Sequence, residues 1–169
     1  MALNSYLKLT GEKQGDIKGS VTQKGRQGKI MVMAFNHEVQ SPRDPASGQA
    51  TGKRIHKPFV ITKEIDMSSP LLYAALVNGE NIITWELQCF AASVRGVEVN
   101  NYTVTLNNAK IADIKSIMLN NKVPENVKMP LMEEVSFIYE KIVWNWVDGG
   151  LIAEDDWLSP LNKSGKTKK

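Results

Sequence analysis

Two histidines, one cysteine and one run of three acidic residues are the groups in this sequence with the most evident chemical potential. His37 and His56 each lack a second histidine or cysteine at the spacing of zinc ligands. Cys89 lies in an alternating apolar run, which is typical of a buried strand position. No Gly-x-Ser-x-Gly sequence is present to hold a serine nucleophile. The sequence therefore predicts neither a catalytic centre nor a metal site, and His56 is expected to have a structural or interface role.

Three other patterns also predict neither a metal, a cofactor nor a nucleic-acid site. The acidic run Glu154, Asp155, Asp156 lacks the alternating ligands and the glycine of a calcium loop, so we interpret it as a solvated strand edge. The glycines of residues 11–20 match neither the phosphate-binding loop nor the dinucleotide fingerprint, and no cofactor is expected. The tryptophans are not interleaved with basic residues as in single-strand nucleic-acid binders, and core packing is their expected role: Trp85, Trp144, Trp146 and Trp157.

The positive net charge of the chain comes from its last seven residues. These include Lys163, Lys166, Lys168 and Lys169 and no acidic residue. Without these four lysines, 17 of the 21 basic residues remain against 18 acidic ones. Proteins that bind nucleic acid usually carry their basic excess on the folded surface, so no nucleic-acid partner is expected. Residues 1–158 are predicted to form a single domain, and residues 159–169 a disordered tail.

The length and hydrophobicity of the chain favour one globular domain. A length of 169 residues can bury one sizeable core. No run approaches the roughly 18 apolar residues that span a bilayer, so no stable membrane insertion is expected. The first residues lack the basic and apolar regions of a secretory signal, which predicts synthesis in the cytoplasm. A single cysteine excludes an internal disulfide.

Apolar periodicity predicts a mainly β protein with one helix, either a small antiparallel β-barrel or a two-sheet sandwich. Strands are expected over 3–9, 29–39, 55–65, 82–90, 97–106, 110–118 and 132–147, and the turn Asp148-Gly149-Gly150 precedes a last one. The helix is expected at about 70–78, with Ser69 as its cap, Pro70 at its first position and Gly79 at its end.

Two segments indicate contacts beyond the domain's own core. Residues 41–53 contain two prolines and two glycines without apolar periodicity, and a plain loop of this length is unusual in a compact domain unless it has a function. The run 132–147 is apolar on both faces of the predicted strand. Cover for its second face could come from the helix, from a long loop or from another subunit.

Three blocks of sequence resemble the haemolysin-coregulated protein family, the tube subunits of the bacterial type VI secretion system. They are GDIKGS at 15–20, GKRIHKPFVITKEIDMSSPLLYAAL at 52–76 and YEKIVWNWVDGG at 139–150. The resemblance runs from about residue 3 to 157. It implies a β-barrel of two sheets with one helix and a long extended loop, and it implies no enzymatic activity.

The resemblance also implies partners and a route through the cell. Members of the family form hexameric rings that stack into a tube, which a contractile sheath surrounds. The tube meets baseplate proteins and a spike protein of the valine–glycine repeat family, and small effectors travel in its lumen. The chain would assemble in the cytoplasm and be secreted by the type VI system without a signal peptide.

Within this resemblance, the loop 41–53 and the strand after it are expected to contact neighbouring subunits. The predicted contact residues are Pro42, Arg43, Asp44, Gly48, Thr51, Gly52, Arg54 and His56. Three alternatives remain open at this point: a tail-tube protein of a contractile phage, a monomeric β-barrel that binds a small ligand, and a hydrolase with an unrecognised site.

Overall fold

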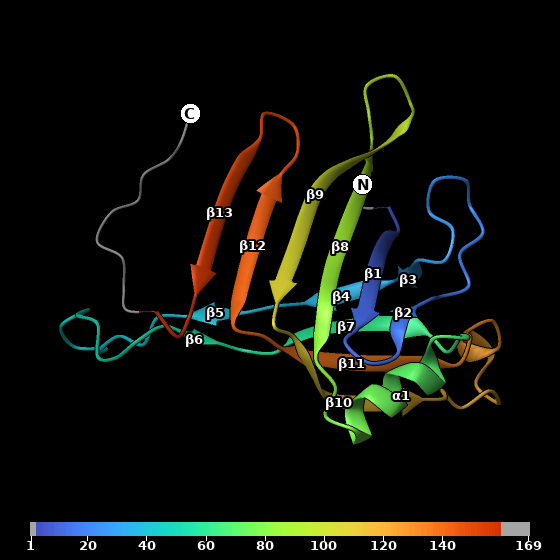
Figure 1. Cartoon of the computed structure of the whole chain (residues 1–169), viewed down its shortest axis with the longest axis horizontal. Coiled ribbons are helices and arrows are strands. Elements are labelled where there is room, and N and C mark those ends of the chain that lie inside the picture. Colours follow the sequence, from blue (N-terminus) through green and yellow to red (C-terminus); the bar gives the residue numbers. More distant parts are fainter. Residues whose placement is uncertain (1–2, 160–169) are drawn as a thin grey trace.

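The computed structural model describes residues 3–159 and contains two large antiparallel sheets, a short two-stranded sheet and one α-helix (Figure 1). The larger sheet has the order β13-β12-β9-β8-β1-β2, and β3 also pairs with β1. Its strands are β1 (Ser5–Gly11), β2 (Gly15–Ile17), β3 (Ile30–Val32), β8 (Ile82–Ala92), β9 (Glu98–Asn107), β12 (Lys141–Trp146) and β13 (Leu151–Asp156).

The smaller sheet crosses one end of the larger sheet, and the helix lies beside it (Figure 1). Its order is β10-β11-β7-β4, with β4 (Ala34–Asn36), β7 (Phe59–Glu64), β10 (Lys110–Ile117) and β11 (Met132–Ile138). The remaining elements are β5 (Val39–Gln40), β6 (Ile55–His56), helix α1 (Ser69–Val77) and the 3-10 turn η1 (Pro124–Asn126), which the sequence did not predict. The sheets are separate ladders, so the fold is the two-sheet form of the predicted class.

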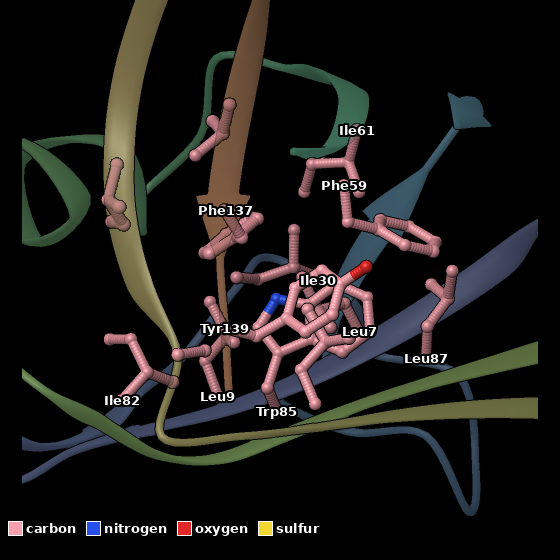
Figure 2. Packing of buried hydrophobic residues seen from close by; sticks show 14 of the residues in the cluster. Leu7, Leu9, Ile30, Phe59, Ile61, Ile82, Trp85, Leu87, Phe137 and Tyr139 are labelled. Atoms are coloured by element: carbon pink, nitrogen blue, oxygen red, sulfur yellow. The ribbon is translucent and has the colours of Figure 1, made fainter. Parts of the chain in front are cut away.

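The core lies where the inner faces of the two sheets meet, and Trp85 is its largest side chain (Figure 2). The Trp85 ring makes edge contacts with Phe59 at 4.9 Å and with Phe137 at 5.6 Å between ring centroids. These two phenylalanines come from β7 and β11 of the smaller sheet. Each fully buried aromatic of this kind contributes on the order of 2–3 kcal/mol to folding, so this contact is a main link between the sheets.

The run 132–147 is two strands and not the single strand expected. The chain turns at Tyr139–Glu140 and passes from β11 in the smaller sheet to β12 in the larger one. Phe137 is buried before the turn and Ile142 after it, so the phase of burial shifts by one residue. The two apolar faces therefore arise because each half of the run lines the core from a different sheet.

Residues 29–39 show the same behaviour, and the single strand expected there is also broken. Met33 separates β3 of the larger sheet from β4 of the smaller one, and its N–H donates to the carbonyl of Thr62 at 2.9 Å. A third piece, β5, pairs with β6. The apolar residues on both faces of this run reflect a passage between sheets, which periodicity cannot distinguish from a strand buried on both sides.

Helix α1 begins at Ser69, so the prediction that Ser69 is the cap is wrong by one residue. Ser68 occupies the cap position without a side-chain cap hydrogen bond, and Pro70 lies at the second helical position. The Ser69 hydroxyl instead donates to Glu133 Oε1 at 2.7 Å and accepts the N–H of Asp66 at 3.0 Å. An ionised carboxylate is a strong hydrogen-bond acceptor, so the Ser69 hydroxyl donates to Glu133 and does not cap the helix.

A buried ion pair joins the start of this helix to the smaller sheet. Lys63 of β7 and Glu133 of β11 are opposite each other in the ladder, and Lys63 Nζ lies 2.7 Å from Glu133 Oε1. The exposed fractions of their side chains are 1% and 0%. Lys63 also donates to Asp66 Oδ1 at 2.9 Å and to the carbonyl of Glu64 at 2.7 Å. The ammonium is thus fully bonded, which a charge at this depth requires.

No helix among residues 3–159 is long and apolar enough to cross a membrane.

Replacing Lys63 with methionine should lower the free energy of unfolding by about 3–5 kcal/mol, because it leaves the Glu133 carboxylate buried without its counter-ion. Urea unfolding followed by circular dichroism measures this loss. The double variant K63M/E133L serves as the control and should recover most of the stability, since it removes both charges. A single variant as stable as the wild type would contradict this account.

Candidate subunit-contact site

Residues 41–53 form an ordered hairpin that projects from one side of the fold beyond β5 and β6 (Figure 1). An isolated bridge pairs Arg43 with Ala50, and the N–H of Thr51 donates to the carbonyl of Pro42 at 3.0 Å. Every residue of the hairpin is exposed or half-buried. The segment is therefore preorganised without a large core contact of its own.

Asp44 organises the tip of the hairpin. Its carboxylate accepts the Ser47 hydroxyl at 2.6 Å and the N–H of Ala46 at 3.1 Å, and these hydrogen bonds lower the pKa of Asp44. Arg43 donates to the carbonyl of Gly48 at 3.1 Å. Gly48 has a φ of 69°, a conformation that side chains other than glycine rarely adopt. The predicted residues Pro42, Arg43, Asp44, Gly48, Thr51 and Gly52 thus lie together on this hairpin.

The other two predicted residues, Arg54 and His56, lie at the base of the hairpin and bind Asp155 of β13. Arg54 Nη2 donates to Asp155 Oδ1 at 2.6 Å, and Arg54 Nε donates to Oδ2. His56 Nε2 lies 2.7 Å from the same Oδ2. The exposed fractions of the Arg54 and His56 side chains are 14% and 2%. These two side chains face the subunit's own sheet edge, whereas the hairpin residues face outward.

A chain of hydrogen bonds continues from Asp155 through His56 to Tyr139 and His37. We call these four residues together with Arg54 the loop-base cluster. The Tyr139 hydroxyl oxygen lies 2.9 Å from His56 Nδ1 and 2.6 Å from His37 Nε2. When His56 donates Nε2–H to Asp155, its Nδ1 can accept a hydrogen bond from the Tyr139 hydroxyl, and the phenol oxygen accepts one from His37 Nε2–H. One orientation of the hydrogens therefore satisfies the whole chain.

The charges within the loop-base cluster are consistent with a carboxylate that stays ionised. Burial opposes ionisation of Asp155, but hydrogen bonds from Arg54 and His56 outweigh it and lower the Asp155 pKa. The bond to Asp155 likewise raises the pKa of Arg54. Burial, and to a lesser extent the charge of Asp155, raises the pKa of Tyr139. The Tyr139 hydroxyl is engaged by both histidines, so the arrangement suits anchoring of the hairpin.

Two aromatic rings pack against the loop-base cluster, the buried Phe59 and the partly exposed Trp157. The His37 ring stacks on Phe59 at 5.1 Å between centroids, with 24° between the ring planes. Trp157 lies 6.3 Å from the His56 ring and donates its indole N–H to the carbonyl of Tyr139. The base of the hairpin is thereby joined to the turn between β11 and β12 and to the end of β13.

Comparisons with known proteins show the family to which this fold belongs. Residues 6–146 match the family model described as "Type VI secretion system effector, Hcp". The chain belongs to the Hcp family. It is therefore a tube protein of the type VI secretion system, and the mainly β fold and the resemblance inferred from three sequence blocks are confirmed.

Individual relatives support the Hcp assignment over nearly the whole chain. The chain is 44% identical over 170 residues to the "Major exported protein" of Pseudomonas aeruginosa strain PAO1, covering 95% of this chain and 99% of that protein. A solved structure described as an Hcp protein has a TM-score of 0.86 at 34% identity, covering 91% of this chain and 97% of the other. A mutant form of Hcp1 from the E. coli EAEC 042 pathovar has a TM-score of 0.81 at 37% identity, covering 92% and 99%.

Three residues of the loop-base cluster, His37, Tyr139 and Asp155, were not among the contact residues predicted from the sequence. The interpretation of the acidic run as a solvated edge is wrong for Asp155, whose side chain is 25% exposed and bound by Arg54. His56 and Asp155 are separated by 99 positions. No local pattern could have paired them, although Tyr139 falls within the third block that resembles the family.

The folding stability of this Hcp chain should fall as the pH is lowered from about 7 to about 5, in part through His37. Burial, with a smaller contribution from His56, lowers the pKa of His37 below its ordinary value of about 6.5. The unfolded chain then binds a proton that the folded chain does not, so this contribution is present above about pH 6.5 and is lost below it.

The variant H37Q keeps a donor for Tyr139 but cannot titrate, so its stability should depend less on pH. Urea unfolding of both proteins at the two pH values measures the difference. Equal pH dependence in wild type and H37Q would show that His37 does not contribute.

Proposed function

We propose that this chain is the ring-forming subunit of a type VI secretion tube, and that six copies close into a ring and the rings stack. Membership of the Hcp family supports the tube, and the exposed hairpin 41–53 is the observation that supports stacking. The hairpin is ordered by its own hydrogen bonds and anchored at its base by Asp155, so little conformational entropy would be lost when it binds a neighbour.

The surface around the hairpin has the composition of an interface. Val39 and Ile55, on the two strands that carry the hairpin, are 41% and 48% exposed. The hairpin itself is polar, with charged groups at Arg43 and Asp44. An apolar centre with polar surroundings is the usual organisation of a protein–protein contact. A neighbour seated on this surface as part of an obligate assembly would bury upwards of about 2,000 Å².

In this proposal the eight predicted contact residues divide into two roles. Pro42, Arg43, Asp44, Gly48, Thr51 and Gly52 touch the neighbouring subunit, whereas Arg54 and His56 hold the hairpin in position. The ring assembles in the cytoplasm and is exported, as the name of the Pseudomonas aeruginosa relative suggests for that protein. A sheath, baseplate proteins, a spike protein of the valine–glycine repeat family and small effectors in the lumen are the partners that such a tube requires. The tail predicted over 159–169 lies, apart from Ser159, outside the described residues.

Deleting Asp44–Thr51 should leave a folded subunit whose rings stack poorly or not at all, because the removed residues make no large contact within the subunit. Negative-stain electron micrographs measure tube length, and circular dichroism checks the fold. The variant V94S is the control, since Val94 lies on a different exposed turn, between β8 and β9. Tubes of normal length from the deletion variant would overturn the role given to the hairpin.

Replacing Asp155 with asparagine should loosen the hairpin while preserving the sheets, because it removes the charge that Arg54 and His56 share. We expect faster hydrogen exchange at the amides of residues 43–51 and shorter tubes, with a loss of stability on the order of 1–3 kcal/mol. D113N, a similar change at an exposed strand residue, is the control. If exchange in the hairpin equalled that of the control, Asp155 would not anchor it.

A further inference from the structure

The larger sheet has two edges to which no strand is paired within the described residues. One edge is β13, which pairs only with β12. The other edge is formed by β3 and β2, which pair one after the other with successive parts of β1. Figure 1 places β13 at one side of the upright sheet and the connection from β2 to β3 at the opposite side. Unpaired strand edges are templates for another strand, so a folded protein has to cover or protect them.

The β13 edge carries a negative charge. Residues 148–156 include Asp148, Glu154, Asp155 and Asp156 and no basic residue. Asp155 forms an ion pair with Arg54, and Glu154 forms one with the partly exposed Lys141 at 2.9 Å. Asp148 and Asp156 form no ion pair within residues 3–159. Leu151 and Ile152 of the same strand are 63% and 64% exposed, so the edge combines acid with uncovered apolar surface.

The opposite edge carries a positive charge. Residues 18–29 contain four basic residues and no acidic one: Lys18, Lys24, Arg26 and Lys29. Arg26 is nearly buried and paired with Glu98 at 2.7 Å, so the three lysines carry the exposed charge of this edge. A hollow of about 210 Å³ at this edge is lined by Lys8, Lys18 and Lys29, with Asp16 as its one acidic side chain. Asp16 already accepts the Thr10 hydroxyl at 2.9 Å.

Positive charge is crowded around this hollow. Burial lowers the pKa of Lys29, and the charges of Lys8 and Arg26 lower it further against the opposing effect of Glu86. Lys8, Lys18 and Lys24 make no ion pair with any residue that the structure describes. An acidic strand placed at this edge would relieve the repulsion.

We propose that the acidic β13 edge of one subunit docks on the basic β2–β3 edge of the next, and that this contact closes the ring. The inference rests on the proposed function and adds the surfaces and the charges that specify it. Two different patches meeting head to tail generate a ring when the rotation closes. Two β13 edges, or two basic edges, would repel each other, so the same charges disfavour an isolated two-fold dimer.

Charge reversal at either edge should break the ring. K8E/K18E/K24E makes both edges acidic, and D148K/E154K/D156K makes both edges basic, with all six side chains at exposed or half-buried positions. Each variant alone should require at least about tenfold more protein to reach half assembly in analytical ultracentrifugation. The matched controls K122E/K128E and E125K change exposed residues far along the chain from both edges and should assemble like wild type. Circular dichroism establishes that each variant is folded.

Mixing the two reversed variants provides the decisive measurement. Each acidic edge of K8E/K18E/K24E would then meet a basic edge of D148K/E154K/D156K, so rings should return with the two proteins in alternation. Native mass spectrometry would show a hexamer with three copies of each. Assembly of wild type should also weaken as salt is raised, because exposed charges are screened.

The outcomes separate this inference from the proposed function. If the wild type forms rings and both charge-reversed variants also form them, the edge pairing is wrong and the ring-forming function stands. Reversed variants that are folded, fail alone and also fail when mixed would overturn the edge pairing too. A wild type that stays monomeric at every concentration would overturn the ring-forming function itself.

Discussion

The carboxylate of Asp155 holds the hairpin 41–53 against the larger sheet by binding Arg54 and His56 at the same time. Both bonds come from side chains within the base of the hairpin, and Asp155 belongs to β13 at the sheet edge. A hairpin without a core of its own would otherwise sample many positions, since its residues are exposed. One partly buried carboxylate therefore fixes the position of the outward-facing residues of the hairpin.

The loop-base cluster is possible because the chain bends between sheets near it. Tyr139 lies where β11 of the smaller sheet gives way to β12 of the larger one, and His37 lies between β4 and β5. These bends bring four segments distant in sequence to one place, where the stacking of His37 on Phe59 connects them to the core. Lys63 lies further along β7 than Phe59. Its buried ion pair with Glu133 holds the start of helix α1, because Glu133 also accepts the Ser69 hydroxyl. Both polar groups occur where the apolar core ends, and both are bonded to several partners, as buried charge requires.

Much of the fold followed from local pattern. Period-two alternation located β8, β9 and β10, and the glycine pair after Asp148 located the hairpin between β12 and β13. Proline and glycine bounded α1 to within one residue. The same alternation failed over 29–39 and 132–147, because a strand that passes from one sheet to another is apolar on both sides, like a strand covered on both faces. The three sequence blocks were enough to place the chain in its family.

What the sequence by itself determined was the class of fold, the exposed polar segment 41–53 and the absence of a familiar catalytic motif, because these depend on residue type and spacing along a short stretch. Tertiary structure decided which side chains anchor that segment. The pairing of Arg54 and His56 with Asp155 joins residues about a hundred positions apart, and it exists only once two sheets have packed around Trp85 and brought β6 beside β13. Tertiary structure also separated the acidic edge from the basic one, since chain order alone does not tell which strands lie at opposite ends of a sheet.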